Sequence, residues 1–424
     1  MKTLDQIAAE LQGYDPQALR ADMVNAFLER MVEPVHGVEG LGLFEALGRA
    51  LAQDVVSPLN VPPHDNSAMD GYAFDGSQLG AAPLHLQVVG TAFAGAAWQG
   101  TVHKGQCLRI MTGAIMPAGL DTVAPQELVQ VDAGVVTIAP GLLSAGDNRR
   151  LGGEDIRAGS IALQKGQQLT PAALGLMASL GIQTVSVVRK LRVAYFSTGD
   201  EVLSLGEPPR EGAIYDSNRY TVFGLLTRMG CEVIDMGVVR DDPALLEAAF
   251  TQAASKADAI ITSGGVSVGA ADHTKAMMHK LGAGSGGVAF WRIAMRPGRP
   301  MAVGRIGKSV LFGLPGNPVA VMVTFLAFVR PALLGMMGST HCQPPLLQAY
   351  STEVMRKKPG RTEYQRGIVS RTYGGSLQVC TTGNQGSGVL SSMVLANGLI
   401  VLHHDQGSVA VGDAVDVMMF DGVI

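Results

Sequence analysis

The chain from residue 191 onward alternates short apolar runs with longer segments of helical spacing. The apolar runs, each of the length of a buried strand, are Leu191–Phe196, Cys231–Gly237 and Ala257–Ile261. The segments with apolar residues three and four positions apart, which is typical of helices, are 215–229, 243–256, 273–281 and 319–334. Strands that alternate with helices in this way predict a parallel sheet with helices on both faces.

The first part of the chain has a different pattern. Residues 1–56 carry apolar side chains at helical spacing over Ala18–Met31 and again over Leu43–Leu51, which predicts packed helices. Short apolar runs separated by glycine then predict a small β-rich module over Phe74–Pro140.

Two further regions complete the pattern. A helix is expected over Thr170–Leu180, with Thr170 as its N-cap and Pro171 at its first position. After Pro344, apolar runs predict a second β-rich region. Its expected strands include Leu377–Thr382, Gly398–Leu402 and Ala414–Phe420.

Composition narrows the class of protein. A length of 424 residues suggests roughly two to four domains, and 47% hydrophobic residues suffice for sizeable cores. The net charge of −4 argues against a general nucleic-acid or membrane-surface binder. No uninterrupted apolar run reaches the ~18 residues that span a bilayer, and the start lacks a signal-peptide pattern, so we expect a cytoplasmic protein without a membrane anchor.

The cysteines are far apart and indicate neither a disulfide framework nor a zinc site; they are Cys107, Cys231, Cys342 and Cys380.

Polar residues follow each of the three predicted strands at the same edge of the sheet. In such sheets, ligands bind outside the carboxyl ends of the strands. Each cluster alone could be a helix cap or a solvated turn, but three on one edge favour a ligand site. These residues are Thr198, Asp200 and Glu201 after the first strand, and Asp241 and Asp242 after the second.

The third strand leads into a glycine-rich stretch, Thr262–Lys275, that precedes a helix. Backbone N–H groups in such a turn can converge on an anion, and an adjacent carboxylate suggests a phosphate with a hard metal ion. The same glycines could also form only a tight turn. The residues of interest are Ser263, Gly264, Gly265, Ser267, Asp272 and Lys275.

In a later loop, Arg296 and Arg299 are each followed directly by a proline. The guanidinium fork suits a doubly charged oxyanion, which it can bind through two N–H groups. The turn Leu314–Pro318 could donate N–H bonds to an anion at a helix start, or merely cap that helix. Other polar features that could hold a phosphate or only join strands are Arg361, Arg366 and the loop Thr382–Gly388.

Two loops near the β-rich module are also rich in polar groups. Residues 60–73 hold two prolines among small polar side chains, as expected of a shaped binding loop or a surface turn. Residues 147–159 combine arginines, acids and glycines, as in an acidic site or a solvated charge cluster.

Six motifs in sequence order resemble the molybdopterin molybdenumtransferases, bacterial proteins similar to the E-domain of gephyrin. The resemblance covers about residues 40 to 420. The motifs are Asp65-Asn-Ser-Ala-Met-Asp-Gly-Tyr-Ala73, Gly153-Glu-Asp-Ile-Arg157, Ser197-Thr-Gly-Asp-Glu201, Tyr215-Asp-Ser-Asn218, Ser263-Gly-Gly-Val-Ser267 with Asp272, and Leu314-Pro-Gly-Asn-Pro318.

The resemblance implies an α/β multidomain protein that forms an elongated homodimer. It implies a helical domain split between 1–58 and 152–190, and an inserted β-rich domain at 59–151. A doubly wound molybdopterin-binding domain at 191–335 and a C-terminal β-barrel at 336–424 complete this expectation.

The resemblance also implies the reaction, in which molybdate reacts with adenylylated molybdopterin and AMP is released with the help of Mg²⁺. Possible protein partners are the molybdopterin adenylyltransferase and other cofactor-biosynthesis proteins. Matched positions give an acidic set of Asp65, Asp155, Glu201, Asp241 and Asp272, of which the last three would bind the metal. The implied substrate-contacting residues are Thr112, Ser197, Thr198, Gly199, Ser263, Gly264, Gly265, Ser267, Lys275, Arg296, Arg299, Pro315, Pro318 and Ser387.

Some features depart from the family or leave alternatives open. The family often carries lysines where Arg296 and Arg299 stand, so the geometry of oxyanion binding can differ. Tungstate has the charge and nearly the size of molybdate, so the sequence does not distinguish between the two oxyanions. The related adenylyltransferase resembles residues 191–335 alone. A scaffold role of the kind gephyrin shows would need a linker fusion, and no long linker is visible.

Overall fold

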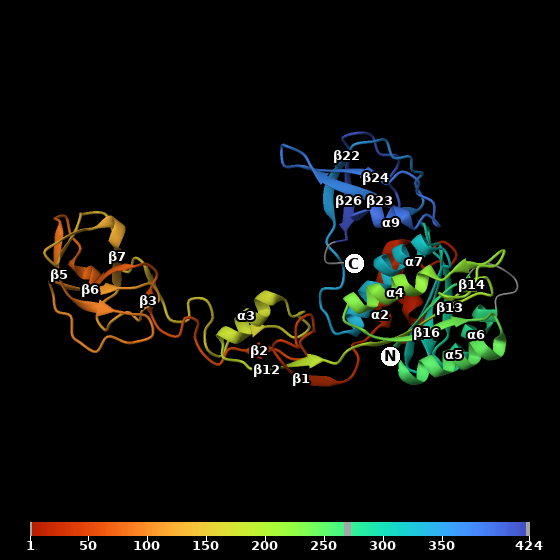
Figure 1. Cartoon of the computed structure of the whole chain (residues 1–424), viewed down its shortest axis with the longest axis horizontal. Helices are drawn as coiled ribbons and strands as arrows, with labels where there is room; N and C mark the ends of the chain where they lie inside the picture. The colour runs from red at the N-terminus through yellow and green to blue at the C-terminus, as the bar shows by residue number, and fades with distance from the viewer. Residues whose placement is uncertain (1, 267–272, 421–424) are drawn as a thin grey trace.

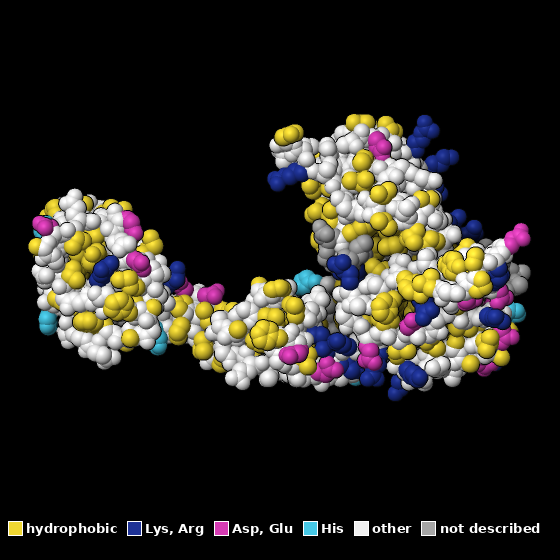
Figure 2. Space-filling model, in the orientation of Figure 1, with side chains coloured by type: hydrophobic (Ala, Val, Ile, Leu, Met, Phe, Trp, Pro, Cys, Tyr) yellow, Lys and Arg dark blue, Asp and Glu magenta, His cyan; other side chains and the backbone are white. Residues whose placement is uncertain are grey.

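The computed structural model is elongated, with its parts arranged side by side along the longest axis (Figure 1). It describes residues 2–266 and 273–420. A β-rich module forms one end, and a small domain containing α3 (Pro171–Ser179) lies in the middle. The other end holds an α/β domain with a β-barrel above it, so an open notch separates the module from the barrel (Figure 2).

The α/β domain is built on a six-stranded sheet. Its strands, in order across the sheet, are β16 (Glu232–Val239), β13 (Arg192–Thr198), β17 (Ala259–Ser263), β21 (Ser309–Leu314), β20 (Pro300–Ile306) and β18 (Val288–Arg292). The first four strands are parallel, as predicted, whereas β20 is antiparallel to both of its neighbours. Only Gly307 and Lys308 separate β20 from β21, and so short a connection permits only an antiparallel hairpin.

Helices cover both faces of this sheet, as the alternation predicts. Successive residues of β13 point to opposite faces: Val193 and Tyr195 join one buried cluster, and Ala194 and Phe196 join the other. The first cluster includes α4 (Ser217–Arg228) and α7 (Pro318–Thr324), and the second includes α5 (Pro243–Lys256) and α6 (His273–Gly282).

One long helix runs through the first cluster. α7 continues through a π-helical segment, η4 (Phe325–Val329), into α8 (Arg330–Met336). Within the described chain, this 19-residue helix is long and apolar enough to cross a membrane, but 89% of its apolar window is buried inside the protein. It is therefore a core helix of the α/β domain.

The N-terminal helix α2 (Ala21–Met31) packs against this core helix, and α1 (Leu4–Glu10) packs against α2. Ile7 and Phe27 are fully buried in the same cluster as the sheet. The helix predicted at Ala18–Met31 is therefore confirmed, with a start at Ala21. Both helices lie with the α/β domain, although the sequence analysis grouped residues 1–58 with 152–190; the division into domains remains a prediction.

The middle domain is formed by two separate segments of the chain. Its elements besides α3 are β1 (Val38–Gly42) paired with β12 (Thr184–Val188), and β2 (Val55–Val56) paired with β11 (Ile161–Leu163). The Thr170 side chain caps α3 by accepting a hydrogen bond from Ala173 N at 3.3 Å, as predicted.

The helix predicted over Leu43–Leu51 is wrong. Residues 43–48 form turns, and Gly48 has a φ of +75°, in the left-handed region that an α-helix does not use. Its N–H donates to Leu169 O at 2.8 Å, and Leu51 bridges to Val187. Tertiary pairing with the returning segment thus overrides a short helical pattern.

The β-rich module contains a mixed six-stranded sheet, as its glycine-separated apolar runs predict. Across the sheet the strands are β7 (Thr122–Pro125), β4 (Gly71–Phe74), β6 (Gln106–Ile110), β5 (Leu84–Ala92), β9 (Val135–Ile138) and β8 (Gln130–Asp132). A short ribbon of β3 (Asn66–Ser67) and β10 (Arg149–Arg150) lies where the two connections to the middle domain meet.

The C-terminal region forms a closed five-stranded barrel. Its strands, in order, are β23 (Thr362–Arg371), β24 (Leu377–Thr381), β22 (Leu347–Ser351), β26 (Ala414–Met419) and β25 (Gly398–Leu402), which pairs back to β23. A strand of the α/β domain, β19 (Met295–Arg296), pairs with β23 and joins the two domains. The remaining short elements are η1 (Gly76–Gln78), η2 (Gln126–Leu128), β14 (Val202–Leu203), β15 (Ile214–Tyr215), η3 (Ala283–Ser285) and α9 (Ser391–Leu395).

Candidate active site

A cavity of about 710 Å³ lies between the carboxyl edge of the parallel strands and the barrel. After β13, the next strand of this sheet along the chain, β16, lies on one side of β13, and the one after it, β17, lies on the other. Such a change of direction opens a crevice at the strand ends, where ligands bind in folds of this kind. The cavity lining includes Glu201, Gly264, Gly265, Arg296, Arg299, Pro315, Asn317, Arg361, Gln385 and Ser387.

Two glycines after β17 bring backbone close to the neighbouring elements. Gly264 and Gly265 have φ angles of +91° and +64°. A Cβ on Gly264 would lie 2.6 Å from Thr198 O, and one on Gly265 would lie 2.3 Å from Thr274 Cβ. Only glycine fits either position, so bare backbone borders the cavity at this turn.

Ser197 and Ser263 turn their hydroxyls into the domain. Tyr195 Oη lies 2.6 Å from Ser263 Oγ and 2.9 Å from Ser197 Oγ, and all three side chains are buried. Burial raises the pKa of Tyr195, so the phenol stays protonated. Thr198 Oγ1 lies 3.4 Å from Ser263 O. These hydroxyls hold the strand ends together beneath the loops and do not line the cavity.

Three arginines line the cavity, two of them in the predicted loop and one, Arg361, from the barrel. Arg296 pairs in register with Glu363 where β19 meets β23. Arg361 Nη2 lies 2.7 Å from Glu363 Oε1. Arg361 carries no local sequence signal that would assign it to the site, because the pairing of residues so far apart in sequence leaves none.

The barrel loop with Ser387 is held in place by a fully buried guanidinium, that of Arg366. Arg366 Nε donates to Ser392 Oγ and Arg366 Nη2 donates to Gly386 O, both at 2.9 Å. Burial lowers the pKa of Arg366 to about 10. Val319 N, at the start of the core helix, donates to Ser387 O at 3.1 Å.

The turn with Pro315 and Pro318 is tied to α4. Asn218 Nδ2 donates to Gly316 O at 2.7 Å, and Pro318 is the first residue of the core helix. Asp216, in the same motif as Asn218, caps α4 by accepting a hydrogen bond from Arg219 N at 3.0 Å. Two motifs about one hundred residues apart in sequence therefore meet at the cavity.

The structure describes two of the three predicted metal-binding carboxylates. Glu201 lines the cavity. Asp241 N donates to Asp200 Oδ1 at 3.4 Å, and Asp241 Oδ1 is buried without a hydrogen-bond partner among the described residues. Asp272 and Ser267 lie outside the described residues. Within residues 2–266 and 273–420, no group of three or more His, Cys, Asp or Glu side chains could hold a metal ion.

Lys275 lies on α6, outside the lining of the cavity. Its Nζ is 4.8 Å from the centre of the Phe290 ring, a cation–π contact.

Asp65, Thr112 and Asp155 lie at the other end of the chain. Asp65 Oδ1 accepts from Gly152 N at 2.8 Å, and Thr112 donates through both N and Oγ1 to Asp70 Oδ1 at 2.7 Å. Asp155 N donates to Val61 O at 3.1 Å. Asp65 directly precedes β3, and Thr112 follows β6 by two residues. Figure 1 shows both strands at the end of the molecule away from the α/β domain, so a single chain does not bring this group to the cavity.

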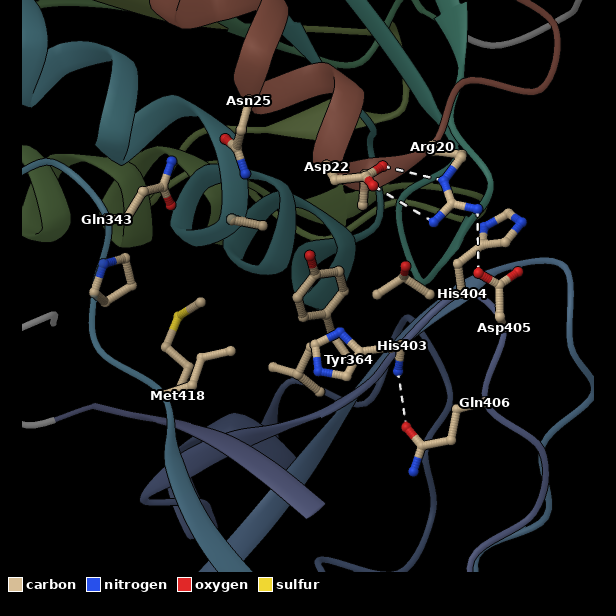
Figure 3. A pocket seen from close by; sticks show the side chains of 16 residues that line it. Arg20, Asp22, Asn25, Gln343, Tyr364, His403, His404, Asp405, Gln406 and Met418 are labelled. Atoms are coloured by element: carbon tan, nitrogen blue, oxygen red, sulfur yellow. Dashed lines mark hydrogen bonds and ion pairs between the residues drawn. The ribbon is translucent and has the colours of Figure 1, made fainter. Parts of the chain in front are cut away.

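A separate cavity of about 420 Å³ lies between α2 and the barrel (Figure 3). Its charged groups satisfy one another: Arg20 contacts Asp22 and Asp405, each at 3.3 Å. It is lined by none of the predicted site residues.

Comparison with protein families matches three consecutive regions of the chain. Residues 19–181 match the MoeA N-terminal region (domain I and II), and residues 194–335 match a probable molybdopterin binding domain. Residues 348–420 match the MoeA C-terminal region (domain IV).

Individual relatives match over nearly the whole length. The chain is 43% identical over 399 residues to a molybdopterin molybdenumtransferase of Haemophilus influenzae, covering 94% of this chain and 97% of the relative. It is 33% identical to a molybdopterin molybdenumtransferase of Bacillus subtilis, covering 90% of this chain and 89% of the relative. The crystal structure of the molybdopterin biosynthesis moeA protein of Pyrococcus horikoshii OT3 superposes with a TM-score of 0.80 at 26% identity, covering 95% of this chain and all of that one.

The fold and the site define a multidomain α/β protein of the MoeA type, an enzyme of molybdenum cofactor biosynthesis. The chain belongs to the molybdopterin molybdenumtransferase family.

Proposed function

We propose that this protein inserts molybdenum from molybdate into adenylylated molybdopterin, with release of AMP, in the 710 Å³ cavity. The observation that carries the proposal is the combination of a glycine turn and three arginines around one space at the strand ends. A phosphorylated substrate and a dianionic oxyanion are the two anions that such a lining suits.

The glycine turn and the arginines have different tasks in this proposal. Bare backbone at Gly264 and Gly265 can approach the phosphate of the pterin substrate closely. Arg296, Arg299 and Arg361 line the same cavity and supply the N–H donors that bind molybdate. Pro315 shapes the space between them.

The chemistry of the carboxylates supports a magnesium ion near the pyrophosphate. Asp241 Oδ1 is buried and lacks a hydrogen-bond partner within the described chain, and hard cations prefer such carboxylate oxygens. Glu201, Asp241 and Asp272 would hold the ion. When bound, it would neutralise negative charge on the pyrophosphate.

A homodimer would complete the site. Asp65, Thr112 and Asp155 lie on the extended end of the chain, away from its own cavity (Figure 1), and a second copy could bring the same residues to it. Large apolar side chains remain exposed, as an interface requires: Phe44 is 95% exposed, and Tyr220 and Phe223 on α4 are 47% and 46% exposed. The proposal also includes two further points. The protein acts in the cytoplasm, and a molybdopterin adenylyltransferase delivers its substrate.

Subunit mixing tests the proposal. Glu201→Ala alters the cavity and Asp65→Ala alters the distant group, so each variant alone should form no cofactor from molybdate and adenylylated molybdopterin. A mixed dimer retains one unaltered site of its two. Mixing should therefore restore about a quarter of the wild-type activity if the subunits reassociate at random, and about a half if all dimers are mixed. Wild-type turnover by folded Glu201→Ala would contradict the assignment of the cavity, and failure of mixing to restore activity would contradict the shared site.

A further inference from the structure

A smaller cavity of about 250 Å³ adjoins the candidate active site on the barrel side. The two cavities share Arg296, Pro297 and Gln385 in their linings. Beyond these shared residues the smaller cavity is lined by Glu353, Arg356, Glu363, Gln365 and Thr381, among others. We propose that it binds the pterin ring of the substrate, an inference that rests on the proposed function and adds a subsite to it.

The order of groups in the substrate supports this placement. In adenylylated molybdopterin the dithiolene lies between the pterin ring and the phosphates, and the adenosine lies at the far end. If the phosphates meet Gly264 and Gly265 and the dithiolene meets molybdate at the arginines, the pterin must continue past Arg296. The smaller cavity adjoins the candidate active site at this residue, because Arg296 lines both cavities.

Glu353 offers a fixed carboxylate in this cavity. Ser351 Oγ donates to Glu353 O at 2.6 Å, and Thr381 N donates to Glu353 Oε1 at 2.7 Å. Among the described residues, Glu353 Oε2 accepts no hydrogen bond. The side chain is thus oriented by one oxygen while the other can accept from a ligand.

The chemistry of a carboxylate distinguishes the two ends of the substrate. The pyrimidine edge of a pterin presents an amino group beside a ring N–H, two donors in a row that a carboxylate can accept together. Adenine presents its amino group beside a ring nitrogen that is an acceptor, which a carboxylate would repel. Glu353 therefore favours the pterin over the adenine.

Two neighbouring side chains complement the pterin further. Gln365 Nε2 donates to Glu363 Oε2 at 3.1 Å, which directs the amide and leaves Gln365 Oε1 as an acceptor. Arg356 is exposed and forms no ion pair with any described residue. An exposed guanidinium such as that of Arg356 can stack on a flat aromatic ring.

Binding of the two halves of the substrate to Glu353→Gln tests the proposal. Glutamine keeps an oxygen to accept from Thr381 N, so the fold should survive, but it places an amide donor where the carboxylate oxygen stood. We expect anaerobic binding of molybdopterin to weaken about 10- to 100-fold, as for loss of hydrogen bonds to a charged group. Binding of AMP should stay within twofold. Glu45→Gln, an exposed acid in the middle domain, is the matched control and should bind both probes like the wild type.

The outcomes separate the subsite from the function as a whole. Unchanged molybdopterin binding by Glu353→Gln, with an active wild type, would overturn the subsite alone. A selective loss of AMP binding would also overturn it, because the cavity would then hold the adenine. A wild-type protein that neither binds molybdopterin nor releases AMP would overturn the proposed function and the subsite with it. A raised KM for the pterin substrate with kcat nearly unchanged would add support, since the ring is bound equally in ground and transition states.

Discussion

Arg361 and Glu363 form an ion pair at the wall of the candidate active site, with Arg361 Nη2 2.7 Å from Glu363 Oε1. The Glu363 side chain is only 3% exposed, whereas that of Arg361 is 42% exposed. Glu363 also accepts from Arg361 Nε at 2.8 Å and from Gln365 Nε2 at 3.1 Å. A buried carboxylate thus anchors the guanidinium of Arg361, a residue that lines the cavity.

Replacement of Arg361 should weaken oxyanion binding. Arg361→Ala removes a charged donor from the cavity and should raise the KM for molybdate at least about tenfold, as for loss of a charge-assisted hydrogen bond. Arg361→Lys keeps the charge but not the paired donors, so its KM should fall between those of the wild type and Arg361→Ala. Steady-state kinetics at varied molybdate concentration measure these KM values. Equal KM values for the three proteins would show that Arg361 does not bind molybdate.

Gly265→Ala should displace the glycine turn. The new Cβ would lie 2.3 Å from Thr274 Cβ, and alanine is strained at a φ of +64°. We expect a loss of about 1–3 kcal/mol in unfolding free energy, or a shifted turn with little activity. Gly284→Ala is the matched control, because its Cβ would have no neighbour within 4 Å. Equal chemical-denaturation curves and activities for both variants would show that the turn does not need glycine.

Loss of the Asn218 amide should affect catalysis more than stability. Asn218→Ala removes the 2.7 Å hydrogen bond to Gly316 O and frees the turn before the core helix. We expect a stability loss of about 0.5–1.5 kcal/mol with a larger proportional fall in kcat/KM. A variant that is less stable but fully active would mean that this bond only supports the fold.

The sequence predicts the α/β domain well because each of its elements carries its own signal. α5 has the predicted bounds, Pro243–Lys256, with the Asp242 side chain capping its first turn. Outside this domain, β25 of the barrel also matches its predicted range, Gly398–Leu402. The expected convergence of polar loops is confirmed for Glu201 and the two glycines, which line one cavity.

What the sequence could not predict depends on pairing between distant segments. Arg361 reaches the cavity only because β19 pairs with β23, and no local pattern reports that register. Ser197 and Ser263 were expected at the substrate, but the hydroxyl of Tyr195 binds both inside the domain. The pattern at Leu43–Leu51 failed for the same reason, since pairing with the returning chain decides its structure.

The buried thiol of Cys107 should be unreactive in the folded protein. Burial raises its pKa from 9.0 to about 12, so very little thiolate forms at pH 8.5. Iodoacetamide should label Cys107 only after unfolding in guanidinium chloride, as peptide mass mapping would show. Rapid labelling in the native protein would contradict the burial of this side chain.

The raised pKa of Cys107 also makes the free energy of unfolding depend on pH in alkaline solution. The folded pKa lies above the unfolded one, so the stabilisation is fully present below pH 9 and is lost as pH rises from 9 toward 12. Each pH unit in this window should cost about 1.4 kcal/mol for this thiol. Urea unfolding of the wild type and Cys107→Ala at pH 8 and 10 measures it: the wild type should lose more stability between the two values than the variant.

Dependence of AMP release on molybdate tests the central claim most directly. The purified protein is incubated anaerobically with adenylylated molybdopterin and Mg²⁺, with molybdate, with tungstate or with neither, and AMP is measured together with metal bound to the pterin. We expect AMP to appear in proportion to inserted metal when an oxyanion is present, and Glu201→Ala to release none. AMP release at the same rate without any oxyanion, or metal-free pterin after complete AMP release, would contradict insertion of molybdenum at this site.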